Sequence, residues 1–372
     1  MCSWADFDSM QEVFKVSCRV EAMTTRGRNW ILASLFWATS VCGLAAEPPL
    51  TRFEFSQPHM GTRFRIVLYA PDAALAARAS DEAFQRIARL DDTMTDYRAG
   101  SELMSLCHKA GGGPVAVSED LFRVLSHSQE LAKQTGGAFD ITAGPVVRLW
   151  RRARRRHELP EKKELAQARR LVGTKYLRLD AEARTAQLLK PGMMLDLGGI
   201  AKGYAADEAL KVLARHGITR ALVAAGGDIA AGEAPPSEAG WRIGIAPLES
   251  PDKPPTRFLL LHDAGVSTSG DAEQHAEIGG IRYSHVIDPR TGRALTGRSS
   301  VTVVAPNATS SDGLATALSV LGPRRALALV RSTPNTATLI LRASKKGTQT
   351  LEYNLAPFVA PAAQGSHMGL PL

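Results

Sequence analysis

The segment Asp196-Leu197-Gly198-Gly199-Ile200-Ala201-Lys202-Gly203-Tyr204 carries the most informative local pattern of the chain. The apolar residues Met194–Leu197 predict a short buried strand, and the residues after the glycine pair predict a helix over 201–216. Backbone amides, the positive end of a helix and the Lys202 ammonium together suit a phosphate or a pyrophosphate. The spacing matches neither the Walker A loop nor the dinucleotide-binding fingerprint. A glycine-containing turn followed by a surface lysine explains the same residues equally well.

Outward from this segment, strands and helices follow one another without strict alternation. Alternating apolar residues predict a strand that ends at Ala70, and helical spacing predicts a helix from Asp72 to about Met94. Further helices are expected over 121–135, 312–321 (capped by Ser310 and Ser311) and 326–331, and strands over 221–225, 241–246, 257–261, 300–304 and 336–341. We therefore predict an α+β fold with mixed, largely antiparallel sheets and packed helices.

Asp312 and Thr316 lie four residues apart on one of these helices and therefore share a face. Leu314, Leu318 and Leu321 mark a different, apolar face. A carboxylate and a hydroxyl one turn apart are hard oxygen ligands that suit Mg²⁺. The alternative is that Asp312, near the expected helix start, only complements the helix dipole.

Three other stretches contain candidates for either chemistry or structure. His285 precedes a predicted turn at 288–292 and is either a general base or a structural histidine of a strand end. Residues 265–271 are expected to form a hydroxyl-rich loop, which lacks the Gly-x-Ser-x-Gly elbow of serine hydrolases. Phe139, in a loop expected over 138–145, is either a stacking surface or a core side chain.

The composition excludes several classes of protein. The chain has 372 residues, of which 44% are hydrophobic and 22% charged, so it is neither collagenous nor a coiled coil nor wholly disordered. The net charge is +8, but without six clustered arginines it would be +2. These arginines are Arg148, Arg151, Arg152, Arg154, Arg155 and Arg156. Because the excess is local and no nucleic-acid motif accompanies it, we expect no nucleic-acid partner, and we predict an exposed connection over 151–160.

The N-terminal region predicts export. Arg26 and Arg28 precede an apolar run over 30–46 that ends in small residues suited to cleavage. The predicted organisation is a misassigned extension over 1–22, a signal peptide over 23–46, the folded domain over 47–356 and a flexible tail over 357–372. The expected location is the periplasm, with a lipid anchor on Cys42 and inner-membrane association as the alternative. Only Cys107 would remain in the mature chain, in an apolar context.

The order and combination of these motifs resemble the ApbE family, the FAD:protein FMN transferases of bacterial envelopes. The resemblance extends from about residue 53 to about residue 340, and the arginine-rich run and the tail depart from it without touching the expected site. It is carried by Met60-Gly61-Thr62, Tyr97, Gly137–Pro145, Asp196–Gly203, Gly226-Gly227-Asp228, Thr268-Ser269-Gly270, Ser284–Pro289, and Asp312 with Thr316.

The resemblance implies a specific activity and site. A member of this family cleaves the pyrophosphate of FAD, attaches FMN through a phosphoester bond to a threonine of a partner protein, such as a subunit of a membrane redox complex, and releases AMP. The implied Mg²⁺ ligands are Asp312, Thr316 and the Gly199 carbonyl. The implied catalytic residues are Asp312 and His285, and His285 would take the threonine proton or assist the leaving phosphate. The positions implied to hold FAD are Met60, Tyr97, Ala138, Phe139, Asp140, Asp196, Lys202 and Ile287.

Two other functions remain open at this point. One is an FAD pyrophosphatase that gives FMN and AMP, with water in place of threonine and the same metal site. The other is a non-enzymatic periplasmic flavin-binding protein, against which metal ligands at the pyrophosphate argue. Whether AMP appears with and without an acceptor discriminates between these possibilities.

Overall fold

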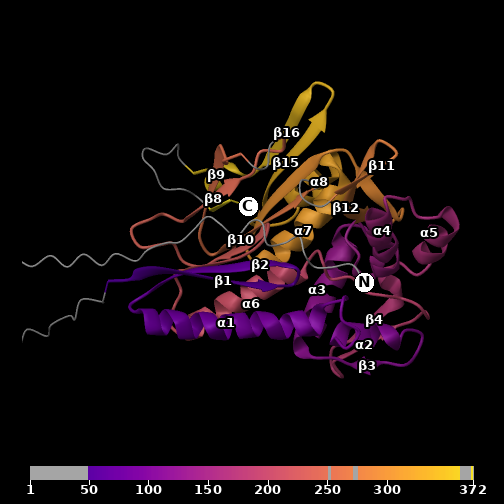
Figure 1. Cartoon of the computed structure of the whole chain (residues 1–372), viewed down its shortest axis with the longest axis horizontal. Helices are drawn as coiled ribbons and strands as arrows, with labels where there is room; N and C mark the ends of the chain where they lie inside the picture. Colours follow the sequence, from indigo (N-terminus) through magenta and orange to yellow (C-terminus); the bar gives the residue numbers. More distant parts are fainter. Residues whose placement is uncertain (1–48, 250–252, 271–274, 361–369, 372) are drawn as a thin grey trace, which may run out of the picture. The chain divides into compact units, whose positions relative to one another are not determined.

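An eight-stranded antiparallel sheet forms the centre of the fold (Figure 1). The computed structural model describes residues 49–249, 253–270, 275–360 and 370–371, so the predicted extension and signal peptide lie outside the described residues. In spatial order the strands are β1 (Thr51–His59), β2 (Thr62–Ala70), β6 (Ala221–Ala225), β7 (Asp228–Ala231), β10 (Ala264–Gly270), β14 (Ser299–Ala305), β15 (Ala337–Ser344) and β16 (Gly347–Tyr353). Every neighbouring pair is antiparallel, as predicted.

Helices and three small sheets surround this central sheet. The helices are α1 (Ala73–Met94), α2 (Glu102–His108), α3 (Glu119–Gln134), α4 (Gly144–Arg156), α5 (Lys162–Arg169), α6 (Ala201–Arg215), α7 (Ala308–Leu321) and α8 (Pro323–Arg331). The small sheets pair β3 (Val115–Ala116), β5 (Thr185–Leu188) and β4 (Leu177–Asp180); β11 (His275–Ile278), β12 (Ile281–Asp288) and β13 (Arg293–Thr296); and β17 (Leu370–Pro371), β8 (Trp241–Ile245) and β9 (Arg257–Leu261). The predicted α+β class is confirmed.

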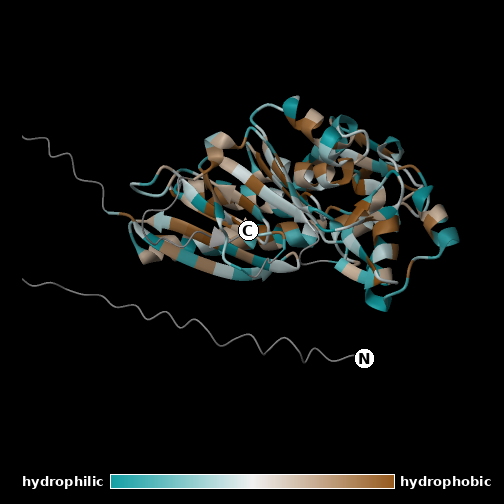
Figure 2. Cartoon of the chain, turned by 90° about the horizontal axis from the view of Figure 1, so that it is seen from above, coloured by the Kyte–Doolittle hydropathy of each residue, from teal (hydrophilic) through white to brown (hydrophobic). Residues whose placement is uncertain are grey.

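The central sheet is buried on both faces. Successive side chains of a strand point to opposite faces, and in β2 Phe64 and Ile66 join the core cluster under α1 and α6. Val67 joins a second cluster on the other face, which includes Ile243 of β8 and Leu259 of β9. Figure 2 shows the corresponding apolar residues on the inner strands and helices. The helices on one face and the β8–β9 layer on the other therefore enclose the sheet.

Helix α4 corrects the exposed connection predicted for 151–160. Val146, Trp150 and Ala153 are buried at helical spacing, and Trp150 Nε1 donates a hydrogen bond of 2.9 Å to the Gly292 carbonyl. The arginines occupy the remaining faces of the helix, which ends at His157 in the left-handed region with φ 54°. The density of charge concealed this apolar stripe in the sequence.

Helix α7 begins four residues before the predicted start at Asp312. The cap is Asn307, not Ser310 or Ser311, and its side chain accepts the Ser310 N–H at 2.9 Å. Asp207 of α6 also accepts the Ala308 and Thr309 N–H groups at 2.9 and 2.8 Å. Asp312 therefore lies in the second turn of α7, where it is no longer a residue of the helix start.

Two other local predictions were wrong. Residues 194–197 pair with no strand among the described residues, although the Asp196 N–H donates to the Ile141 carbonyl at 2.8 Å. The hydroxyl-rich stretch predicted as a loop is mostly β10, whose residue Thr268 pairs with Thr302 of β14. In the predicted tail, Ala356–Phe358 is a 3₁₀ helix and Leu370–Pro371 pairs with β8, and the flexibility of 357–372 stays a prediction.

Among the described helices, none combines the length and apolar character that a membrane span requires.

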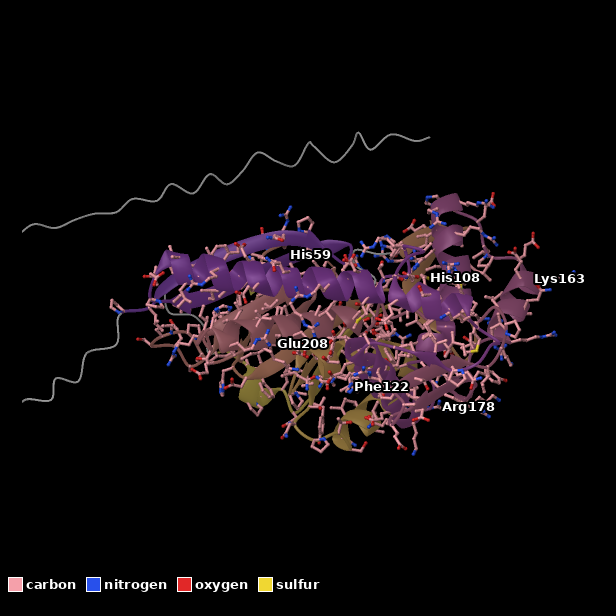
Figure 3. All side chains as sticks on the ribbon, turned by 90° about the horizontal axis from the view of Figure 1, so that it is seen from below. His59, His108, Phe122, Lys163, Arg178 and Glu208 are labelled. Atoms are coloured by element: carbon pink, nitrogen blue, oxygen red, sulfur yellow. The ribbon has the colours of Figure 1, made fainter. Side chains whose placement is uncertain are left out.

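Arg86 of α1 connects α1 with α3 and α6 through charge. Its guanidinium donates to both oxygens of Asp120, at 2.6 and 2.5 Å, and to Glu208 at 2.5 Å. Tyr204 donates to Asp120 at 2.8 Å. Figure 3 labels Glu208 on the side of the molecule where α1 lies. Burial would raise the pKa of both carboxyl groups, but hydrogen bonds lower it: those from Arg86 and then Tyr204 for Asp120, and those from Lys211 and then Arg86 for Glu208.

We expect Arg86→Met to lower the free energy of unfolding by about 2 kcal/mol, because two poorly exposed carboxylates lose charge-assisted hydrogen bonds, although Asp120 keeps Tyr204 and Glu208 keeps Lys211. Since both carboxyl pKa values are depressed in the folded state, this contribution is present above the ordinary values of 3.8 and 4.5 and is lost as the pH falls below them. Urea unfolding at pH 7 and at pH 3 measures both effects. The control is Arg123→Met, which breaks an exposed pair with Glu119 and should cost under about 1 kcal/mol. Equal losses in the two variants would contradict this role of Arg86.

Candidate active site

The Lys202 ammonium lies between two buried carboxylates. Lys202 is in the first turn of α6, where its Nζ pairs with Asp228 and lies 3.7 Å from an oxygen of Asp312. Asp228 begins β7 directly after a glycine pair, and Asp312 comes from α7. The two carboxylate side chains are only 6% and 5% exposed. Three elements distant in sequence therefore assemble one charged centre.

Gly203 allows α6 and α7 to approach closely enough to form this centre. A Cβ at Gly203 would lie 2.2 Å from the Ala308 carbonyl oxygen and 2.9 Å from Asp312 Cβ, so no larger residue fits. The Gly203 N–H donates to Asp312 at 3.1 Å. The close contact thus fixes the orientation of the carboxylate as well as the packing of the helices.

The centre carries more negative than positive charge. Burial, and then repulsion by Asp228, raises the pKa of Asp312, and Lys202 only partly opposes this rise. Burial would lower the pKa of Lys202, but Asp228 and Asp312 raise it above its ordinary value, so the ammonium stays charged. Two carboxylates that share one ammonium suit the binding of a further cation.

The three predicted metal ligands lie together beside this centre. A Cβ on Gly199 would lie 2.9 Å from Thr316 Oγ1 and 3.4 Å from the Phe139 ring, so the turn before α6 touches α7 one turn after Asp312. Within the described residues, no group of three or more His, Cys, Asp and Glu side chains could hold a metal. Ligation here would therefore depend on a hydroxyl and a backbone carbonyl in addition to the carboxylate of Asp312.

A second charged group contains two of the predicted FAD-binding residues. Asp196 accepts the Gly198 N–H at 2.9 Å and Arg151 Nη2 at 2.7 Å, and Arg151 also pairs with Asp96. The Arg151 guanidinium carbon lies 4.7 Å from the centre of the Tyr97 ring, which is 77% exposed. The expectation that the arginine-rich run leaves the site untouched was therefore wrong.

The other predicted FAD-binding positions are less open. Ala138 and Phe139 are buried, and Phe139 borders Gly199. Asp140 accepts the Thr142 N–H and hydroxyl at 2.8 and 2.6 Å, and burial raises the pKa of Asp140. Met60 lies in the β1–β2 turn with φ 49° and donates its N–H to Asp91 at 3.2 Å.

His285 and Ile287 lie on β12, which packs against two helices of the site. Ile287 is buried with Trp150 of α4, and the intervening Val286 contacts Ala138 and Val320 of α7. His285 is partly exposed on this strand. The predicted turn after it is confirmed by the Gly292 N–H, which donates to the Asp288 carbonyl at 2.8 Å.

Sequence reasoning did not select Asp228 or Arg151 as site residues. The sequence does contain a signal for Asp228, because this aspartate directly follows an apolar segment and the glycine pair Gly226-Gly227. The other segment with an aspartate near a glycine pair, Asp196–Gly199, was selected. Arg151 had none, since it is one of six arginines in a single run. Its contacts with Asp196 and Tyr97 depend on the fold.

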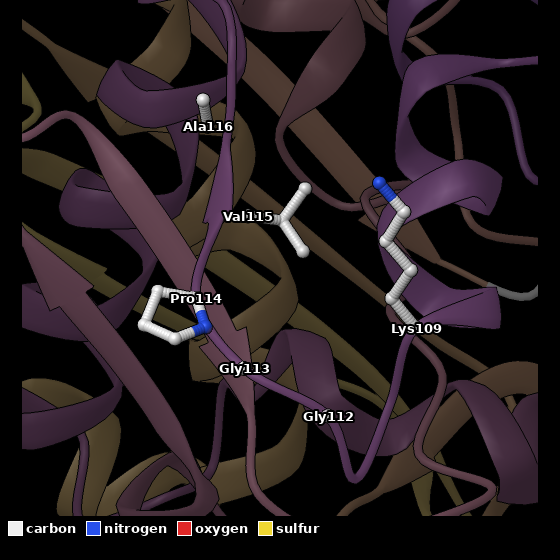
Figure 4. A pocket seen from close by; sticks show the side chains of 6 residues that line it. All are labelled: Lys109, Gly112, Gly113, Pro114, Val115 and Ala116. Carbon is white, nitrogen blue, oxygen red and sulfur yellow. The ribbon is translucent and has the colours of Figure 1, made fainter.

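A surface cavity lies in another part of the molecule. It is lined by Lys109 and residues 112–116 (Figure 4), none of which belongs to the predicted site. Lys109 is the only charged side chain of this lining. We therefore assign no catalytic role to the residues of this cavity.

The comparisons with known proteins agree with this architecture. The profile of the ApbE family matches residues 60–340. Proteins named FAD:protein FMN transferase from Treponema pallidum and Vibrio cholerae are 31% and 30% identical, over 86% and 90% of this chain and 92% and 99% of theirs. The structure of the flavin transferase ApbE from Vibrio cholerae superimposes with a TM-score of 0.74 at 30% identity, over 83% of this chain and 100% of that one. The ApbE protein of Thermotoga maritima also gives 0.74, at 27% identity, over 82% and 98%.

The fold is therefore the one found in solved flavin transferases. Because the family profile covers most of the described chain, and relatives of 30% identity or more align over nearly their whole length, the chain belongs to the ApbE family.

Proposed function

We propose that this protein is an FAD:protein FMN transferase that needs Mg²⁺. The observation that carries the proposal is the buried centre of Lys202, Asp228 and Asp312 beside Gly199 and Thr316. With a divalent cation bound, such a centre could neutralise a pyrophosphate, and phosphoryl transfer depends mainly on positioning and on charge stabilisation. The relatives are named FAD:protein FMN transferase, and this name is our basis for proposing FAD as the substrate.

The residues present fit a magnesium ion. Asp312 and Thr316 offer a carboxylate and a hydroxyl one turn apart, Gly199 offers a carbonyl, and the centre has an excess of negative charge. When bound, Mg²⁺ would supply charge neutralisation at the pyrophosphate oxygens. Lys202 would add a second positive charge there, held in place by Asp228.

The proposed reaction exchanges one phosphorus–oxygen bond for another. The hydroxyl of an acceptor threonine attacks the phosphorus on the FMN side of FAD, the bond to the AMP oxygen breaks, and AMP leaves with that oxygen. His285 takes the proton of the threonine. Asp196 and Tyr97 would hold the nucleotide, with Asp196 accepting hydrogen bonds and Tyr97 offering its exposed ring.

AMP release tests this function against the alternatives. The protein is mixed with FAD and Mg²⁺, with and without an acceptor domain, and nucleotides are separated by chromatography. We expect AMP to accumulate faster with the acceptor and to stop in EDTA. Equal rates with and without the acceptor would indicate a pyrophosphatase, and FAD that remains intact in both would indicate a flavin-binding protein.

The proposed location is the periplasm, because Arg26, Arg28 and the apolar run over 30–46 have the order of a signal peptide. We expect the exported protein to begin near Ala46 or Glu47. Mass spectrometry of the protein recovered from the periplasm measures this start. A lipid-modified N-terminal Cys42 would show the wrong type of signal, and a full-length cytosolic chain would refute export.

A further inference from the structure

We infer that Arg151 is a positioning residue for the flavin nucleotide: it holds the Asp196 carboxylate and the Tyr97 ring in the places where they meet the ligand. The inference rests on the proposed function, because it takes Asp196 and Tyr97 to contact FAD. It concerns a residue of the arginine-rich run, which departs from the family's pattern.

The backbone of Arg151 is fixed by its neighbours in α4. Trp150 is 4% exposed, packs against Tyr283 and donates its indole N–H to the Gly292 carbonyl. Ala153 is buried in the same cluster. The Arg151 side chain, 18% exposed, therefore extends from a rigid helix rather than from a loop.

The guanidinium joins two carboxylates that would otherwise repel each other. Asp96 and Asp196 are 10% and 13% exposed, and each accepts a hydrogen bond from a different nitrogen of Arg151. Burial, and then the charge of Asp196, raises the pKa of Asp96, whereas Arg151 and Arg148 oppose this rise. Arg154 is a further cation nearby, and burial and then the charge of Arg151 lower its pKa. Without Arg151, repulsion between the two carboxylates would turn the Asp196 side chain away from Asp96. Asp196 would then lose its hydrogen bond from the Gly198 N–H.

Arg151 also supports Tyr97. Its guanidinium carbon lies 4.7 Å from the ring centre, while 77% of the tyrosine remains exposed. A guanidinium on a ring face is a favourable cation–π arrangement. A ring held in this way and otherwise open is suited to stack on a planar ligand. Because one guanidinium contacts both Tyr97 and Asp196, it sets the distance between a stacking surface and a hydrogen-bond acceptor.

The test measures FAD binding apart from catalysis. FAD affinity is determined by fluorescence in EDTA, and KM, kcat and thermal stability are measured on the same preparations. Arg151→Met is compared with Arg152→Met. Arg152 lies next to Arg151 on α4, and its replacement breaks a more exposed ion pair with Glu164 of α5. We expect Arg151→Met to weaken FAD binding and to raise KM by about 10–100-fold, as for the loss of a charge-assisted hydrogen bond, with kcat within about threefold. Arg152→Met should bind FAD normally.

Arg151→Lys keeps the charge and the fold but cannot contact both carboxylates, so we expect an intermediate FAD affinity. FAD binding by Arg151→Met equal to that of the wild type would overturn the positioning role. A purely structural role would lower thermal stability and kcat together, with Arg151→Lys behaving as the wild type in FAD affinity, and would also overturn it. If the wild type bound no FAD either in EDTA or with Mg²⁺, the proposed function would fail together with this inference.

Discussion

Replacing Asp312 with asparagine is expected to slow FMN transfer by about 10³-fold or more, since metal-assisted charge stabilisation contributes several kcal/mol to such reactions. Asparagine has nearly the same shape and keeps an oxygen for the Gly203 N–H bond, but it lacks the negative charge that would bind the cation beside Lys202. Initial rates measured across a Mg²⁺ titration provide the test. We expect the variant to need far more Mg²⁺ for its residual activity.

Asp207→Asn is the matched control for this variant. Asp207 is a buried carboxylate that joins the same two helices by accepting N–H groups at the start of α7. Its loss should lower thermal stability and leave the Mg²⁺ dependence unchanged. Two results would refute the assignment of Asp312 as a metal ligand. One is an Asp312→Asn enzyme with the Mg²⁺ dependence of the wild type, and the other is a variant that, like Asp207→Asn, loses only thermal stability.

His285→Asn is expected to slow transfer by about 10²–10⁴-fold, the usual contribution of a general base. An imidazole can accept a proton near neutral pH, whereas an asparagine side chain offers hydrogen bonds but cannot act as a base. His285 is partly exposed on β12, whose Val286 packs against α7, the helix of Asp312. We therefore expect near-normal FAD affinity in this variant.

FAD binding, thermal stability and transfer rate on the same His285→Asn preparation separate chemistry from structure. If His285 only stabilises the strand end, the melting temperature and FAD affinity fall together. Turnover at saturating FAD would then stay close to normal. That second pattern would remove His285 from the mechanism.

Local periodicity in the sequence predicted most of the long helices but only half of the central sheet, namely β2, β6, β14 and β15. The strands over 221–225 and 257–261 have the predicted bounds, because apolar β-formers end there at glycine or at charged residues. Helix α4 was missed because three buried residues were spread among six arginines. The start of α7 was missed because Ser310 and Ser311 were taken as the cap in place of Asn307, and because Asp207, a residue of another helix, also accepts N–H groups there.

The site was predictable only where one segment carries several features. The common helix face of Asp312 and Thr316 follows from helical spacing, and Thr316 lies beside Gly199. The partner of Lys202 could not be predicted from spacing, because Asp228 lies 26 residues further along the chain, at the start of the inner strand β7. Likewise, the contact of Arg151 with Asp196 joins helix α4 to a loop that follows it by about 40 residues, so local sequence patterns do not predict it.

The most direct test of flavin transfer is a mass-spectrometric measurement on the acceptor. The wild-type protein is incubated with FAD, Mg²⁺ and the purified periplasmic domain of a redox-complex subunit, and the acceptor is mapped by peptide while AMP is quantified in the same reaction. We expect one FMN on a threonine for each AMP released, and at least about 10³-fold slower formation of both products with Asp312→Asn. AMP that forms while the acceptor stays unmodified, or FAD that stays intact, would contradict it.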